Sequence, residues 1–264
     1  MESIEDLLAA FDEQRRAEPP APPAGVWHEQ DGPLLRVVGE DRGFIAAPRD
    51  TGARGAGLDL LISRQRDYFA ARGEAVEWKT YGYDQPADLT ARLRAAGFVP
   101  EDPETVLVAL SADVAAEPVP PDGVALRQVT ADADMRAIAD MESRVWDTDR
   151  SWTGDRLIRE LAAAQADMAI LVAEAGGRVV AAGWLTFRPG TQFAGLWGGA
   201  TLREWRGRGI YRALVAARAQ LAATAGARYL QVDASSNSAP ILRRLGFRAL
   251  TTTTPYVWSP PAPN

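Results

Sequence analysis

The clearest alternation of apolar and polar positions lies in the second half of the chain, where short apolar runs are separated by glycine turns. Two runs flank Ala175-Gly176-Gly177, an arrangement typical of a β-hairpin. The alternation around Gln231 indicates a half-buried strand, with Leu230 and Val232 toward the core. We expect strands at residues 124–129, 169–174, 178–187, 191–202, 229–233 and 247–258.

Helical periodicity appears between these strands. Ile210, Leu214, Ala217 and Leu221 are spaced by four, three and four residues, which predicts a helix over residues 209–224 that buries these side chains. Further helices are expected at residues 131–145, 152–165 and 239–245.

The first half of the chain has a shorter version of the same order. Four prolines in residues 18–25 predict an extended linker after a first helix in residues 1–16. Further along we expect strands at 34–38, 43–47, 76–81 and 104–110, and helices at 58–72 and 88–96.

Two short patterns recur between the halves. Arg54-Gly55-Ala56-Gly57 precedes a helix, as Arg206-Gly207-Arg208-Gly209 does, and Gly97-Phe98 matches Gly246-Phe247. The separation of about 150 residues indicates an internal duplication. We therefore predict two related lobes, residues 1–117 and 118–264, with the proline-rich boundary between them. The first lobe is expected to be degenerate, because polar residues interrupt its strands before the glycine turn.

The turn at residues 206–212 has the composition of an anion site. A strand, a short glycine loop and a helix direct free backbone N–H groups at an anion. Gly207 and Gly209 lack the Cβ atoms that would keep a phosphate from the backbone, and Arg206, Arg208 and Arg212 supply three cations. A dinucleotide site is the competing interpretation, but Arg212 stands where its third glycine is expected.

These residues resemble the coenzyme A loop of the GNAT acetyltransferase superfamily, [Arg/Gln]-x-x-Gly-x-[Gly/Ala]. Arg206 fills the first position, Gly209 the fourth, and Tyr211 replaces the last small residue. The segment from Asn237 to Phe247 is similar to the superfamily's following motif, and Leu242 stands where many members carry a tyrosine that protonates the leaving thiolate.

The resemblance implies an α/β (α+β) fold: a mixed, mostly antiparallel sheet flanked by helices, in a tandem-lobe form. It implies acetyl-CoA as co-substrate and no metal. The residues expected to contact coenzyme A are Thr201, Leu202, Arg206, Gly207, Arg208, Gly209, Ile210, Tyr211, Arg212 and Asn237. Thr201 and Leu202 would act through their backbone groups on the pantetheine arm and the thioester carbonyl.

Composition narrows the chemistry. The 264 residues carry a net charge of −6, which argues against a nucleic-acid or membrane partner. The chain has no cysteine and one histidine, His28, so a thiolate nucleophile and a Ser-His-Asp triad within the chain are excluded. No run is long and apolar enough to span a bilayer, and the acidic start lacks the basic region of a signal peptide, so a cytoplasmic location is expected.

The acid and base of the reaction are less evident. Direct transfer to an amine needs a group that removes the amine proton. Asp233, at the end of a strand, is the main candidate base, with Asp147 and Asp149 as alternatives. Tyr211 or Tyr256 could replace the missing tyrosine at position 242, although each could equally be a packing residue. The residues Trp146, Trp152 and Trp197 could shape an acceptor pocket or belong to the core.

We therefore expect an N-acetyltransferase that moves an acetyl group from acetyl-CoA directly to a small-molecule or peptide amine. A catalytically silent protein that binds or senses acyl-CoA is the alternative, because the usual acid is missing and no base is evident. The two-lobe layout is also similar to that of the mycothiol synthases, which act on a cysteinyl amine, but no motif points to that acceptor.

Overall fold

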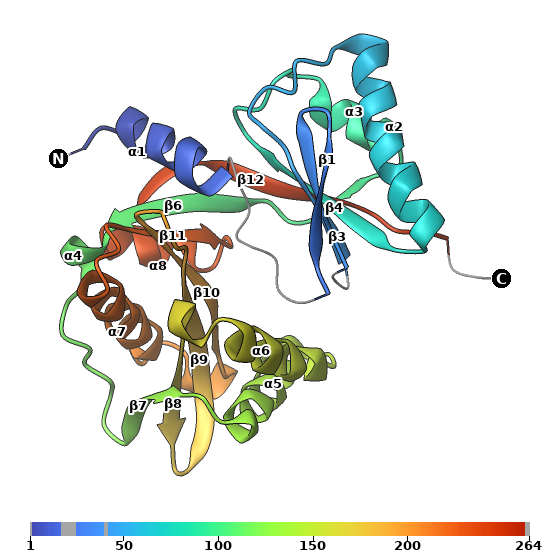
Figure 1. The fold of residues 1–264 in the computed structure, drawn as a ribbon. Coiled ribbons are helices and arrows are strands. Elements are labelled where there is room, and N and C mark those ends of the chain that lie inside the picture. The colour runs from blue at the N-terminus through green and yellow to red at the C-terminus, as the bar shows by residue number, and fades with distance from the viewer. Residues whose placement is uncertain (1, 17–24, 40–41, 262–264) are drawn as a thin grey trace. The chain divides into compact units, whose positions relative to one another are not determined.

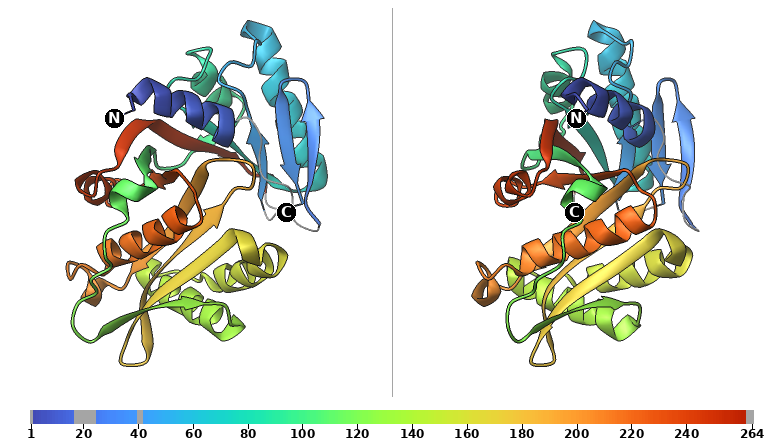
Figure 2. Two further views of the ribbon diagram at one scale, coloured as in Figure 1. Left: turned by 60° about the vertical axis from the view of Figure 1, so that its left-hand side comes forward. Right: turned by 90° about the vertical axis from the view of Figure 1, so that its left-hand side faces the viewer.

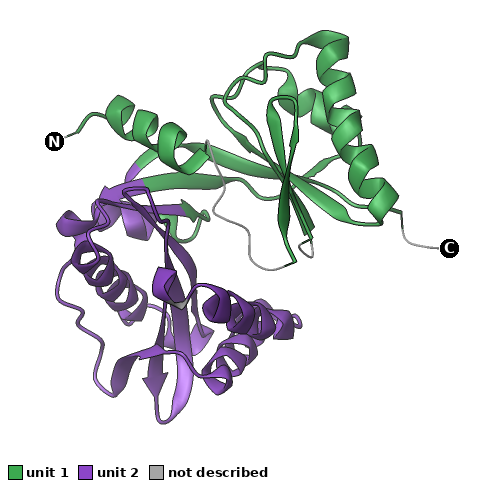
Figure 3. Ribbon diagram, in the orientation of Figure 1, with its two compact units in different colours: residues 1–107, 233–239, 249–264 green, residues 108–232, 240–248 purple. Residues whose placement is uncertain are grey.

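The computed structural model describes residues 2–16, 25–39 and 42–261, so most of the predicted linker, residues 18–24, lies outside the described residues. The chain forms two compact units (Figure 3). Unit 1 comprises residues 1–107, 233–239 and 249–264, and unit 2 comprises residues 108–232 and 240–248. The chain therefore changes unit inside strand β6, Glu104–Leu110, and its last strand returns to unit 1.

Unit 1 is built on strands in the order β1, β2, β3, β4 and β12. Their bounds are Trp27–Asp31, Leu34–Val38, Arg42–Ala46, Ala75–Tyr81 and Arg248–Trp258. The β3–β4 pair is parallel, and the other pairs along this series are antiparallel. The core is lined by apolar side chains of β4, of helix α2 (Gly55–Arg72) and of helix α3 (Leu89–Ala95), including Trp78, Phe69 and Leu93. The unit also contains α1 (Ile4–Phe11), a π-helical turn at Asp12–Arg16, and the two-residue strand β5 (Val99–Pro100), which pairs with β12.

Unit 2 is an antiparallel meander extended by one parallel strand. Its strands run in the order β7, β8, β9, β10 and β11, with bounds Val124–Val129, Met168–Ala175, Arg178–Phe187, Phe193–Thr201 and Tyr229–Ala234. Helices α5 (Asp132–Trp146) and α6 (Ser151–Ala163) lie on one side of these strands and α7 (Ile210–Thr224) on the other, as Figures 1 and 2 show. Because both faces are covered, β8 is apolar and buried along almost its whole length.

Unit 2 also contains short helical elements. Helix α4 (Ser111–Val114) packs against α7, a 3-10 turn at Gln165–Asp167 precedes β8, and α8 (Ala239–Arg244) precedes β12. Ser111 fixes α4, because its hydroxyl donates to the carbonyl of Ala227 and its amide to that of Arg228.

Most predicted elements are present, and the differences have physical reasons. The predicted helix over 1–16 is α-helical only to Phe11. Strand β1 was not predicted, because its polar sequence shows no alternation and its partner β2 holds it in register. In α7, the prediction that Ala217 and Leu221 are buried is wrong. Both are half-buried, and Ala219, Ala222 and Arg218 occupy the buried face instead.

The units do not follow the predicted boundary at 117/118, which stays a prediction about the sequence. Strand β12 comes from the end of the chain, yet residues Thr253–Trp258 pair with Tyr81–Val76 of β4 in unit 1. A division of the sequence into two consecutive lobes therefore differs from the division by packing.

Candidate functional site

Strands β10 and β11 are paired over only a short stretch. Their parallel pairing covers only Phe193–Gly195 against Tyr229–Gln231, although β10 continues to Thr201. On its other edge, β10 stays paired with β9 as far as Thr201. Among the described residues, the edge of β10 that faces β11 is therefore without a strand partner over Leu196–Thr201. The carbonyls of Trp197 and Thr201 accept from arginine side chains, and the other backbone groups of this edge could pair with an extended ligand.

The turn after β10 presents backbone donors. A 3-10 turn at Arg203–Trp205 leads to Gly207 and Gly209, whose φ angles of 76° and 89° are left-handed and favour glycine. The first backbone bond of α7 runs from the Ala213 amide to the Gly209 oxygen, so the amides of 210–212 precede the helical pattern. Among the described residues, the amides of 207–212 have no hydrogen-bond acceptor. The helix dipole adds positive charge at the same place.

The three predicted cations of the turn are exposed. The Nε atom of Arg206 donates to the Thr201 oxygen at 3.0 Å, which ties the turn to the end of β10. The guanidinium of Arg208 lies over the Trp205 ring, 4.7 Å from its centroid. Within the described part of the chain, none of Arg206, Arg208 and Arg212 forms a salt bridge, so their charges remain available to an anion.

Thr201 and Leu202 stand at the base of this turn. The Leu202 amide donates to the Val180 oxygen at 2.9 Å, and its side chain is buried. The Thr201 hydroxyl is buried and finds no partner in the part of the chain that is described. A buried hydroxyl without a partner is costly, and a ligand atom at the end of β10 would satisfy it.

Tyr211 packs against a bulge in β10. The register of β10 with β9 shifts between Gly198 and Ala200, and both Gly198 and Gly199 have left-handed φ angles. A methyl group on Gly199 would stand 2.9 Å from Cε2 of Tyr211, so the ring lies directly on this backbone. The phenol that replaces the family's small residue thus covers the bulge, and burial raises its pKa.

Arg218 is a residue that the sequence analysis missed. It lies seven residues after Tyr211 on the same buried face of α7 and is 1% exposed. Its guanidinium donates to the carbonyls of Leu214 at 3.0 Å, Trp197 at 3.1 Å and Trp184 at 3.3 Å. The only sequence signal was its place one turn after Leu214, at a position of the helix that faces the strands.

Three predicted site residues belong to unit 1. Asn237 is exposed in the turn before α8. Tyr256 is 3% exposed within the apolar core of that unit, and this burial fits the packing interpretation. A catalytic role for Tyr256 stays a prediction.

Asp233, the predicted base, forms a salt bridge with Lys79 at 2.5 Å, with both side chains largely buried. Burial alone would lower the pKa of Lys79, but the charge of Asp233 raises it. Nearby, burial and the Asp233 charge raise the pKa of Glu104 to about 7. Asp233 is thus held in a largely buried salt bridge, and its role as the proton acceptor stays a prediction.

The loop between α5 and α6 is open to solvent. Trp146 and Trp152 are 59% and 45% exposed, and the guanidinium of Arg150 lies over both rings. Asp149 accepts the Ser151 amide at the start of α6, and this bond lowers its pKa. Trp197, on β10, is 43% exposed and donates to the Thr186 hydroxyl. These tryptophans are therefore surface residues of unit 2, as an acceptor pocket would require.

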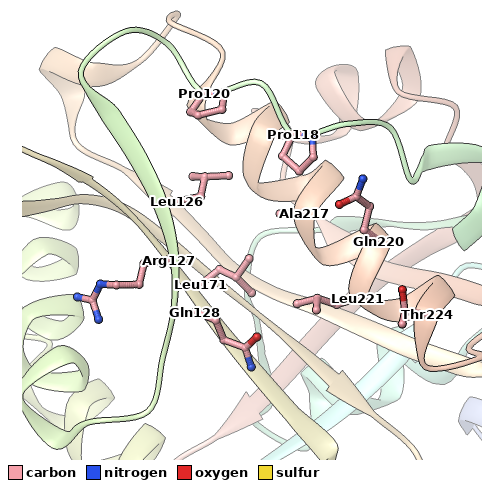
Figure 4. A pocket seen from close by; sticks show the side chains of 10 residues that line it. All are labelled: Pro118, Pro120, Leu126, Arg127, Gln128, Leu171, Ala217, Gln220, Leu221 and Thr224. Carbon is pink, nitrogen blue, oxygen red and sulfur yellow. The ribbon is translucent and has the colours of Figure 1, made fainter.

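A cavity of about 500 Å³ lies elsewhere in unit 2 (Figure 4). It is bounded by Pro118 and Pro120, by Leu126 of β7, and by Ala217, Leu221 and Thr224 in the second half of α7. It is therefore separate from the glycine turn at the start of the helix. Among the described residues there is no cluster of potential metal ligands, and no helix is long and apolar enough to cross a membrane.

Known proteins are similar to this chain in part of the sequence and in the fold. Residues 135–247 match the model of the acetyltransferase (GNAT) family. No curated protein matches the chain in sequence. The fold is similar to that of a GCN5-related N-acetyltransferase from Kribbella flavida, at 20% identity and a TM-score of 0.68, over 98% of this chain and 95% of that one.

A second similar structure is a tandem GNAT protein from the clavulanic acid biosynthesis pathway, at 16% identity and a TM-score of 0.65, over 98% and 94% of the two chains. A third, from Sphaerobacter thermophilus, has 18% identity and a TM-score of 0.62 over 97% and 85%. The predicted fold class, a mixed and mostly antiparallel sheet flanked by helices, is confirmed. Residues 135–247 therefore match the acetyltransferase (GNAT) family, and the fold of the chain is similar to that of GCN5-related N-acetyltransferases and of a tandem GNAT protein.

Proposed function

We propose that this protein transfers an acetyl group from acetyl-CoA to an amine, with the coenzyme held by unit 2. The observation that carries the proposal is the combination of an unpaired edge on β10 with a donor-rich turn at its end. The edge, Leu196–Thr201, suits an extended amide chain such as pantetheine, and the free amides of 207–212 suit a diphosphate.

The residues present fit the coenzyme. The unpartnered Thr201 hydroxyl supplies a polar atom at the end of the edge. Gly207 has open space where a Cβ would stand, so a phosphate can approach its backbone. The exposed guanidinium groups of Arg206, Arg208 and Arg212 would neutralise phosphate charge. Ile210 would contribute its backbone amide. The backbone groups of Leu202 are hydrogen-bonded to Val180 and Trp205. The contacts of Leu202 and Asn237 with the coenzyme, which the family resemblance implies, stay predictions.

Transfer would be direct. Coenzyme A supplies an acetyl group activated as a thioester, and backbone donors along β10 would stabilise the oxyanion that forms at its carbonyl. Because the chain has no cysteine, a thiolate acyl-enzyme cannot form. The amine proton would leave to water, since Asp233 is held by Lys79.

Isothermal titration with acetyl-CoA tests the proposal. We expect one molecule to bind per chain, and an amine panel followed by thiol release should then identify an acceptor. Failure of acetyl-CoA to bind at millimolar concentration would refute the assignment.

A catalytically silent acyl-CoA-binding protein remains the second candidate. Leu242, 0% exposed, stands at the usual acid position, and Asp233 is neutralised by Lys79. The two functions separate in one experiment, because only an enzyme yields an acetylated amine whose formation is abolished by Arg206→Glu.

A further inference from the structure

Arg218 is a buried cation of unit 2 that binds only backbone oxygens. Its guanidinium donates to the carbonyls of Leu214, Trp184 and Trp197, and among the described residues it forms no salt bridge. Burying a guanidinium without an opposite charge is unfavourable, and carbonyl dipoles offset only part of that cost. Burial lowers the pKa of Arg218 to about 10, so the group is still charged at neutral pH. The reason for retaining this cation therefore lies in the backbone that it binds.

Two of its acceptors stand beside the bulge of β10. Trp184 of β9 lies opposite Trp197 of β10, and Nη1 of Arg218 reaches both carbonyls, at 3.3 and 3.1 Å. The register of the two strands shifts immediately afterwards, between Gly198 and Ala200. A bulge leaves a residue outside the regular ladder of hydrogen bonds, so a contact from a third element can fix its geometry. Arg218 of α7 provides that contact.

The bulge begins with two glycines whose conformation needs such support. Gly198 and Gly199 have φ angles of 68° and 86°, and glycine has more conformational freedom to lose than any other residue. The carbonyl of Trp197 points at Arg218, and the C=O and N–H of one trans peptide unit point in opposite directions. The Gly198 amide therefore points away from Arg218. By holding one oxygen, the guanidinium sets the orientation of the peptide unit at which the left-handed pair begins.

The packing around the bulge is matched to this contact. A methyl group on Gly183 of β9 would stand 2.7 Å from Nη1 of Arg218, so a glycine there makes room for the guanidinium. A methyl group on Gly198 would stand 2.4 Å from the Trp184 ring. Glycines on both strands thus allow a cation and an indole ring to close on the bulge.

Resting on the coenzyme site proposed above, we propose that Arg218 is a positioning residue for that site. By fixing the peptide between Trp197 and Gly198, it holds the edge of β10 in the shape that pairs with the extended arm of coenzyme A. Among the described residues, β11 does not pair with β10 beyond Gly195, so other contacts must shape the edge from there. An edge that is already shaped loses less conformational entropy when a ligand pairs with it. The three acceptors of Arg218 lie outside the turn at residues 207–212, so its effect falls on the edge.

The test measures the affinity of two probes by isothermal titration. Acetyl-CoA would bind to the edge and the turn, whereas adenosine 3′-phosphate 5′-diphosphate has no pantetheine arm and would bind to the turn alone. Arg218→Lys keeps the charge but loses the planar set of donors, so we expect acetyl-CoA affinity to fall about tenfold. In the same variant, affinity for the nucleotide should change less than about twofold.

A second variant reaches the same contact from the other side. Gly183→Ala keeps Arg218 in the sequence and displaces its guanidinium with a methyl group, so it should show the same selective loss. Arg36→Lys is the matched control in unit 1, because Arg36 is 5% exposed and is hydrogen-bonded to Gln65. It should leave both affinities unchanged, even where it lowers stability, since the proposed site consists of the β10 edge and the glycine turn of unit 2.

The outcomes distinguish this inference from the proposed function. If acetyl-CoA does not bind wild type, the proposed function itself fails. If acetyl-CoA binds wild type but the nucleotide does not, the division of the coenzyme between edge and turn is refuted, and the positioning role with it. If both probes bind, and Arg218→Lys and Gly183→Ala weaken both equally or neither, the positioning role is refuted and the proposed function survives.

Discussion

The two glycine turns of the chain have similar sequences and different surroundings. In unit 1, the guanidinium of Arg54 forms two bonds of 2.8 Å with Asp50, whose Oδ1 also accepts the Gly52 amide. In unit 2, Arg206 donates to the Thr201 carbonyl, and it forms no salt bridge with a described carboxylate. The unit 1 turn therefore has a protein carboxylate that neutralises its arginine, whereas the arginines of the unit 2 turn form no salt bridge among the described residues.

The strands that precede the two turns differ in how much of their length is paired with the next strand. Strand β3 pairs with β4 from Arg42–Ala75 to Ile45–Trp78, which is nearly its whole length. Strand β10 pairs with β11 over three of its nine residues. Unit 1 has therefore closed the edge that unit 2 leaves open. A glycine turn alone does not predict a coenzyme site, because an open strand edge and uncompensated cations are also needed.

The largest expected effect is on acetyl-CoA affinity. Arg206→Glu should weaken binding about 100-fold, because it places a negative charge beside the diphosphate. Arg54→Glu is the matched variant in unit 1 and should change affinity less than about twofold, since the proposed site consists of the β10 edge and the glycine turn of unit 2. Isothermal titration measures the acetyl-CoA affinity of both variants. Equal losses of affinity would contradict the proposed difference between the two turns.

A smaller effect is expected from the glycines themselves. Gly209→Ala and Gly55→Ala both place a side chain at a left-handed φ, 89° and 51°, and each should cost about 1 kcal/mol of folding stability. Only Gly209→Ala should also reduce acetyl-CoA affinity, by about tenfold, because it tilts the amides that bind phosphate. Denaturant unfolding and titration give the two readouts. An affinity loss in Gly55→Ala would contradict the account.

The buried charges of unit 1 predict a pH effect. The pKa of Glu104, raised to about 7 by burial and Asp233, lies above its value of 4.5 in an unfolded chain. The folded state thus binds the proton more tightly, and stability should fall as pH rises from 4.5 through about 7. Glu104→Gln should flatten this fall and, after allowance for solvent screening, be about 1 kcal/mol more stable than wild type above neutral pH. Denaturant unfolding at several pH values tests the direction of this stability change. A Glu104→Gln variant that is less stable than wild type above neutral pH would contradict the prediction.

The smallest effect concerns the carboxylate in the unit 1 turn. The hydrogen bond from Arg54 lowers the pKa of Asp50 from 3.8 to about 2, so its contribution is present above 3.8 and lost as pH falls through 2. Asp50→Asn should remove this acid dependence with little change at neutral pH, because the pair is exposed. It should not create a second acetyl-CoA site, since the β3–β4 edge stays closed. Binding of two acetyl-CoA molecules per chain would show that the Asp50 carboxylate alone prevents the unit 1 turn from binding the coenzyme.

The features that could be predicted from the sequence are those that depend on local patterns. The glycine turn, the α7 helix and the hairpin after β8 depend on residues close in sequence, and these were predicted. The salt bridge between Lys79 and Asp233 joins residues 154 positions apart, and no local pattern contains it. For the same reason, the sequence of β12 predicts a strand without naming β4 as its partner.

Arg218 illustrates a second limit. Helical periodicity assigns apolar residues to the buried face of a helix, and arginine is rarely buried. The burial of Arg218 was therefore not predicted. The glycines at 183, 198 and 199 leave the space that Arg218 and Tyr211 fill, but this complementarity appears only when strand and helix are placed together.

Hydrogen exchange of the backbone amides tests the central claim most directly. With saturating acetyl-CoA, the amides of residues 207–212 should become protected from exchange, because these free amides then bind phosphate, while residues 52–58 of the unit 1 turn should exchange as before. Unchanged exchange at residues 207–212 in the presence of bound coenzyme, or equal protection of both turns, would contradict the account.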